Sequence, residues 1–139
     1  MIRMSARRIV TAVTTLCFVG GGLAIAAPAA NADTLVCLAK VTAVQNINNT
    51  AISDDAAGNT AAAASEDAGA AAYFAQAESD CYFNPAVTYL AYTNAVGGFT
   101  YVNAALSDNN AGNAAAGLAD GRTAAGFLAT AVRDLNTGP

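Results

Sequence analysis

The chain has 139 residues, of which 55% are hydrophobic, ten are acidic, six are basic and none is histidine. The lack of histidine excludes Ser-His-Asp and Cys-His catalytic sites and the commonest kinds of zinc site. The acidic balance argues against binding to nucleic acid or to anionic membranes, because both require basic patches.

The first segment, residues 1–32, has the pattern of a secretory signal peptide. Its basic residues are followed by a nearly uncharged apolar run from Ile9 to Ala26, and Ala30-Asn31-Ala32 is a small-x-small cleavage site. The apolar run is long enough for a marginal membrane anchor, but the cleavage tripeptide favours removal. We therefore expect an extracellular, secreted protein with no membrane span after cleavage.

The mature region, residues 33–139, is long enough for one small domain. Three of the six basic residues are removed with the signal peptide, so ten carboxylates face three cations and the net charge becomes −7. The remaining cations are Lys40, Arg122 and Arg133.

Cys37 and Cys81 are the only cysteines of the mature region. A single pair in a secreted protein predicts a disulfide. Such a bond closes a loop of about 45 residues and contributes roughly 4 kcal/mol in the chain-entropy model. A redox role is the weaker alternative, because the pair is not a Cys-x-x-Cys motif.

Residues 51–80 resemble residues 105–134 at a shift of 54 positions. Thirteen of the thirty aligned residues are identical, and five of these identities are not alanine. The best-matching stretches are ISDDAAGN at 52–59 and LSDNNAGN at 106–113. We interpret the pattern as a diverged internal duplication.

The duplicated unit is predicted to be a helical hairpin. Alanine is the best helix former, and Gly-Asn at 58–59 and 112–113 supplies turn chemistry. Asn59 lies midway between the two cysteines, so folding the chain there brings the cysteines together. Asn84-Pro85 is a helix N-cap followed by proline at the first helical position.

The expected fold is all-α: an up-down-up-down four-helix bundle built from two duplicated hairpins, at about 34–81 and 85–135, with one disulfide. The predicted helices cover 34–56, 60–81, 85–106 and 113–135. The alternative is a pair of loosely associated hairpins that dimerise to complete a core.

Apolar stripes predict which helix faces are buried. Gly97-Gly98 is expected to bend the third helix or to allow close approach, and Asn48 falls near the first stripe, where a buried amide could fix the register. The first predicted stripe is Cys37, Val41, Val44, Ala51 and Ile52, and the last is Ala114, Leu118, Gly121, Ala125, Leu128, Val132 and Leu135.

Carboxylates are the remaining chemistry. Two pairs of acids could serve as catalytic groups of a hydrolase, namely Glu66-Asp67 and Glu78 with Asp80. We interpret both pairs instead as exposed acids that keep the surface soluble. At the turn end, Asp and Asn oxygens could bind Ca²⁺. Their spacing is not that of an EF-hand, however, and these residue types are also expected as helix caps and turn formers. We therefore predict no metal and no cofactor. The weak metal candidates are Asp54, Asp55, Asp108 and Asn110.

Aromatic side chains are scarce and are expected to gather at the disulfide end, either as a core plug or as a binding site. We therefore expect a non-enzymatic protein that acts by interaction with an unknown protein or polysaccharide. The alternative is a carrier of a small apolar ligand. The candidate binding residues are Tyr73, Phe74, Tyr82, Tyr89, Tyr92 and Phe127.

Overall fold

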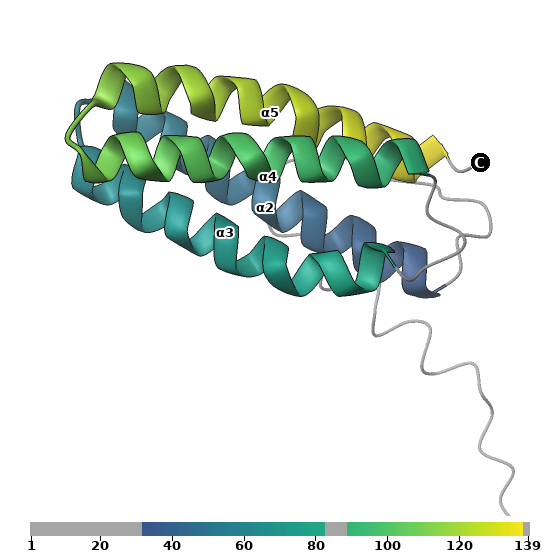
Figure 1. Cartoon of the computed structure of the whole chain (residues 1–139). Helices are drawn as coiled ribbons and strands as arrows, with labels where there is room; N and C mark the ends of the chain where they lie inside the picture. The colour runs from purple at the N-terminus through teal and green to yellow at the C-terminus, as the bar shows by residue number, and fades with distance from the viewer. Residues whose placement is uncertain (1–31, 83–88, 138–139) are drawn as a thin grey trace, which may run out of the picture.

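The computed structural model describes residues 32–82 and 89–137, and the elements in these two ranges are all α-helices (Figure 1). The helices are α2 (Ala32–Ala56), α3 (Thr60–Tyr82), α4 (Tyr89–Asn110) and α5 (Ala114–Thr137). They form a helical bundle in which α2 and α4 each pack against both α3 and α5. The all-α prediction is confirmed. The predicted signal peptide, up to residue 31, and the predicted cap at 84–85 lie outside the described residues.

Buried side chains recur in all four helices at alternating intervals of three and four residues. This is the seven-residue repeat of helices that pack along a narrow seam. Alanine and glycine occupy much of the seam, so the helices can approach one another closely. The repeat is formed by residues 34, 37, 41, 44, 48, 51 and 55; 63, 67, 70, 74, 77 and 81; 91, 95, 98, 102, 105 and 109; and 117, 121, 124, 128, 131 and 135.

The predicted stripes agree only partly with these positions. The stripe of α2 is confirmed except at Ile52, which is half-buried. In α5 four residues of the predicted stripe are only half-buried: Ala114, Leu118, Ala125 and Val132. The buried seam residues are instead Gly117, Ala124 and Ala131, each of which directly precedes a predicted one. At two of these three positions, 118 and 132, the prediction favours the larger side chain. The closest helix contacts instead require the smallest residues.

Gly97 and Gly98 permit a close approach of α4 to α5. A Cβ atom on Gly98 would lie 2.7 Å from Cγ of Leu128, which is fully buried. A Cβ atom on Gly97 would lie 2.8 Å from Cδ1 of Phe127. The second of the two predicted roles of this glycine pair, close approach, is therefore the one observed.

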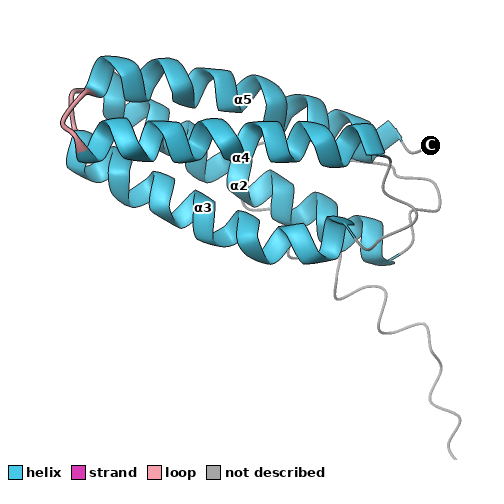
Figure 2. Ribbon diagram, viewed as in Figure 1, coloured by secondary structure: helices cyan, strands magenta, loops and turns pink. Residues whose placement is uncertain are grey.

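The two short turns, between α2 and α3 and between α4 and α5, lie at the same end of the bundle (Figure 2). Gly58 and Gly112 adopt positive φ angles of 78° and 76°, a conformation that glycine adopts without the steric cost of a Cβ atom. Their backbone hydrogen bonds are also alike. Asn59 N–H donates to Asp54 C=O at 2.8 Å, and Asn113 N–H donates to Asp108 C=O at 2.9 Å.

The end of α4 differs from the prediction. The sequence predicts a helix end at residue 106, before a turn at 107–113, but the helix continues to Asn110. The reason is that Asn109 occupies the next seam position and is buried against other helices. Its side chain has partners there, so one more helical turn is favourable before Gly112 ends the helix.

The predicted disulfide is confirmed. Cys37 near the start of α2 and Cys81 near the end of α3 are bonded, with Cα atoms 5.1 Å apart. Both residues are buried seam positions. In the ranges that the structure describes, none of the helices is both long and apolar enough to cross a membrane.

The burial pattern recurs at the same shift that relates the two halves of the sequence. All the seam positions from Cys37 to Cys81 are buried, and so is the corresponding position of each one in the second half, from Ala91 to Leu135. Many of the paired residues differ in kind: Val44 corresponds to Gly98, and Phe74 to Leu128. The recurrence of burial is therefore stronger than the recurrence of sequence.

Candidate functional site

A cluster of buried polar side chains lies near the turn end of the bundle. Asp55 comes from the last turn of α2, Asp67 from early in α3, and Asn109 from the end of α4. The Asn109 Nδ2 atom donates hydrogen bonds to Asp55 Oδ2 at 3.1 Å and to Asp67 Oδ2 at 2.9 Å. All three residues are at least nine-tenths buried. We call these three residues the polar cluster.

Two glycines of α5 make room for polar side chains from other helices. A Cβ atom on Gly117 would overlap the side-chain amide of Asn109. Gly121 is seated against α2, and its carbonyl oxygen accepts a hydrogen bond of 3.0 Å from Nδ2 of the fully buried Asn48. Asn48 is thus buried and paired across the bundle, and its role in fixing the register stays a prediction.

The polar cluster is acidic, and the ion pairs in ranges 32–82 and 89–137 are formed elsewhere. Lys40 pairs with Asp80, and Arg133 pairs with its neighbour Asp134. Burial raises the pKa of Asp67 from 3.8 to about 6. The hydrogen bond from Asn109 opposes this shift, while the negative charges of Asp55 and Glu66 add to it.

This location corrects one prediction from the sequence. Glu66-Asp67 is interpreted there as a pair of exposed acids, but the Asp67 side chain is 1% exposed. The sequence contains the necessary signal, because residue 67 falls on the same seven-residue repeat as residues 74 and 81. Residue type alone predicts the opposite location, because an aspartate is expected at the surface.

Two oxygens of the polar cluster are buried without a hydrogen bond. Asp55 Oδ1 and Asn109 Oδ1 have no partner among the described residues. Buried acceptors of this kind are uncommon and destabilising. Asp55 Oδ1 and Asn109 Oδ1 can therefore each accept a further hydrogen bond.

The weak metal candidates are not equivalent in the structure. Asp55 is buried in the polar cluster, Asp54 and Asp108 are half-buried, and Asn110 is exposed. In the described ranges, no three His, Cys, Asp or Glu side chains are grouped closely enough to hold a metal ion. The two turns bring these residues to one end of the bundle, but their surroundings there differ.

A second acidic pair lies nearer the surface, between α4 and α5. Slight desolvation raises the pKa of Asp120, and the neighbouring Asp108 adds to the shift through its charge and a hydrogen bond. The residues 54 positions earlier, Glu66 and Asp54, are also acidic. These four carboxylates add to the acidic character of the turn end.

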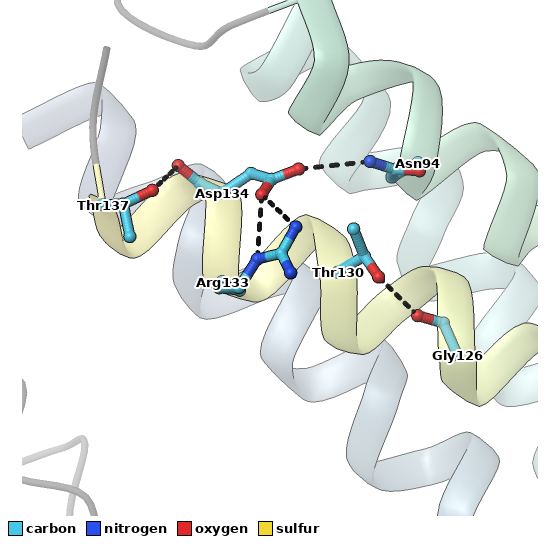
Figure 3. A network of polar contacts seen from close by, with 6 residues as sticks. All are labelled: Asn94, Gly126, Thr130, Arg133, Asp134 and Thr137. Atoms are coloured by element: carbon cyan, nitrogen blue, oxygen red, sulfur yellow. Dashed lines mark hydrogen bonds and ion pairs between the residues drawn. The ribbon is translucent and has the colours of Figure 1, made fainter.

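At the other end of the bundle, Asp134 links α5 to α4 (Figure 3). Its Oδ2 accepts a hydrogen bond of 3.2 Å from Asn94 Nδ2, and its Oδ1 accepts from the Arg133 guanidinium. The Lys40–Asp80 ion pair joins α2 to α3 at the two equivalent positions of the first half. Each hairpin thus uses an aspartate at the same position to contact its other helix.

The candidate aromatic residues have different surroundings. Phe74 is buried and stacks on Phe99, with ring centroids 4.5 Å apart. The Tyr92 hydroxyl donates to Glu78 at 3.3 Å. Phe127 stacks on Tyr101 but stays partly exposed. Tyr73 and Tyr89 are exposed, whereas the side chain of Tyr82 lies outside the described part.

The large apolar side chains that are exposed in the described ranges form three pairs. Tyr89 is 83% exposed and Leu90 is 60% exposed, so these two contribute the most. Each exposed residue of the first hairpin has an exposed apolar counterpart at the equivalent position of the second. The pairs are Leu35 and Tyr89, Val36 and Leu90, and Tyr73 and Phe127.

The polar cluster and the paired exposure are the features that sequence reasoning missed. Comparison with protein-family profiles, with curated proteins and with solved structures finds no match for this chain.

Proposed function

We propose that the protein is a secreted binding protein without catalytic activity, which contacts a protein partner through two equivalent apolar faces. In this proposal residues 1–32 are a cleaved signal peptide. The mature chain is an up-down-up-down bundle made by duplication of one hairpin. The recurrence of the buried seam positions and of both glycine turns supports the duplication.

The observation that carries the binding function is the paired exposure of Leu35 with Tyr89 and of Val36 with Leu90. Isolated apolar residues are common on protein surfaces. Exposure kept at the same two positions in both halves of a diverged duplication is better explained by two similar contact faces. Aromatic residues also dominate binding hot spots.

Two alternatives receive less support. An enzyme would need a pair of free, accessible acid–base groups. Asp67 of the first candidate pair is buried, whereas in the second pair Asp80 forms an ion pair with Lys40 and Glu78 accepts a hydrogen bond from Tyr92. A carrier of a small apolar ligand would need space among the aromatics, whereas Phe74 and Phe99 are already stacked on each other.

Retention of partners on the immobilised secreted protein tests the proposal. The double variant Tyr89→Ala/Leu90→Ala should reduce retention of proteins from the producing cells and their medium by about tenfold or more, as hot-spot losses do. The matched control at the opposite end is Asp54→Ala/Asn110→Ala, which should leave retention unchanged.

A further variant tests the equivalence of the two faces. Leu35→Ala/Val36→Ala should lower the number of partner molecules bound per chain, and combining it with the first double variant should abolish binding. Circular dichroism confirms that each variant is folded. If the turn-end substitutions abolish retention and the Tyr89 variant binds normally, the functional end has been misassigned.

A further inference from the structure

The polar cluster joins helices that otherwise have little contact. Asp55 belongs to the first hairpin and Asn109 to the second, and they come from α2 and α4, which are not among the closely packed helix pairs. Asp67 adds α3 to the same contact through Asn109. A single amide nitrogen therefore holds three of the four helices together at this end.

The amide cannot neutralise the two carboxylates. Both Oδ2 atoms lie about 3 Å from the same nitrogen, so the two carboxylates are close neighbours. Like charges this close in a buried site repel strongly, and one of the groups then prefers to be protonated. Asn109 donates hydrogen bonds but carries no charge.

The surroundings add no compensating cation. Toward Asp67, α2 contributes Asp55, α3 contributes the neighbouring Glu66, and α4 contributes the neutral Asn109. From α5 the seam residues at this end are Gly117 and Gly121, which have no side chain. Within the described residues Lys40 pairs with Asp80 and Arg133 pairs with Asp134. Arg122 of α5 is exposed and is not among the charges that shift the pKa of Asp67.

We propose that Asp55, Asp67 and Asn109 form a proton-operated latch between the two hairpins, closed when Asp67 is protonated and weakened when it is ionised. A protonated Asp67 no longer repels Asp55 and gains an O–H that can donate to a neighbouring acceptor. Asp55 Oδ1 is a buried acceptor in need of such a donor. The raised pKa of Asp67, about 6, places the transition just below neutral pH.

The direction of the pH dependence follows from linkage. Asp67 binds its proton more tightly in the folded chain than in the unfolded chain, where the pKa is near 3.8. Its contribution to stability is therefore gained as the pH falls from above 7 through 6 towards 4, and lost as the pH rises again. Carboxylates that are stabilised by folding show the opposite pH dependence. A stability that increases as the pH falls is therefore the signature of the latch.

The test is a thermal unfolding series of the full secreted chain at closely spaced values between pH 7.5 and 5. The melting temperature of the wild type should rise by about 5–10 °C as the pH falls, given the usual relation between stability and melting temperature in small domains. Asp67→Asn, which mimics the neutral acid, should raise the melting temperature at pH 7.5 and flatten the profile.

Two further variants make the result specific. Asp55→Asn removes the repelling charge and should flatten the profile as well, and it provides the test if Asp67→Asn does not fold. Asp120→Asn alters the other acid with a raised pKa and should keep most of the wild-type rise. A melting temperature that is constant or falls between pH 7.5 and 5 overturns the latch. So does an Asp67→Asn variant that keeps the wild-type profile.

Discussion

Asp55 and Asn109 lie 54 positions apart, the same shift at which the sequence resembles itself, and they are hydrogen-bonded to each other at 3.1 Å. An aspartate at both positions would place two charges in contact, while one aspartate and one asparagine form a hydrogen bond. The contact therefore favours a neutral hydrogen-bond donor at position 109 as the partner of Asp55.

Alanine at the turn glycines should destabilise the bundle. Gly58→Ala and Gly112→Ala each force a Cβ atom into a left-handed backbone conformation, at a cost of about 1–2 kcal/mol. No neighbouring atom lies within 4 Å of the added Cβ at either site, so backbone strain is the sole cause. Urea unfolding measures the loss. Similar losses at the two sites are expected, and unchanged stability at both would contradict the turn geometry.

Alanine at Gly98 tests the close contact between α4 and α5. The added Cβ meets the fully buried Leu128 side chain, and overpacking of this kind costs about 1–3 kcal/mol. Gly126→Ala in α5 is the control, because nothing lies within 4 Å of the added Cβ. That change should stabilise the helix by about 0.5–1 kcal/mol. Equal effects of both changes on the melting temperature would argue against the close packing.

The buried side chain of Asn48 should contribute more to the free energy of unfolding than that of its exposed neighbour, Asn49. Asn48→Ala removes the hydrogen bond to Gly121 and leaves a small void, which together cost about 1–3 kcal/mol. Asn49→Ala, on the exposed side of α2, should change the free energy of unfolding by less than about 0.5 kcal/mol. Denaturant titration of both variants gives the comparison, and a neutral Asn48→Ala would remove the argument for a structural amide.

Loss of the disulfide should lower stability without changing the helical fold. Replacing Cys37 and Cys81 by serine frees a loop with a sequence separation of 44, and about 4 kcal/mol is lost in the chain-entropy model. Chemical denaturation with and without a reducing agent measures the difference. The wild type should respond to the reducing agent, while the double serine variant should not. Free thiols on freshly secreted, folded protein would contradict the bond.

Local chemistry in the sequence was sufficient to predict the all-α class, the two turns and the disulfide. Alanine propensity, the repeated Gly-Asn turns and one cysteine pair all act over short distances or through simple pairing. These features therefore do not depend on how the four helices meet. The predicted end of α4 is four residues too early, because Asn109 resembles a turn residue until its buried partners are known.

Only the tertiary structure decided which polar residues are buried. Asp67 and Asn109 are typical surface residues by composition, and their burial depends on partners from other helices and on the space left by Gly117. Burial then sets the charge state, because a carboxyl group in a packed interior loses the water that stabilises its ion. The sequence thus determined the helices and their turns, whereas the electrostatics of the polar cluster arose only when Asp55 and Asp67 were brought to the distant Asn109.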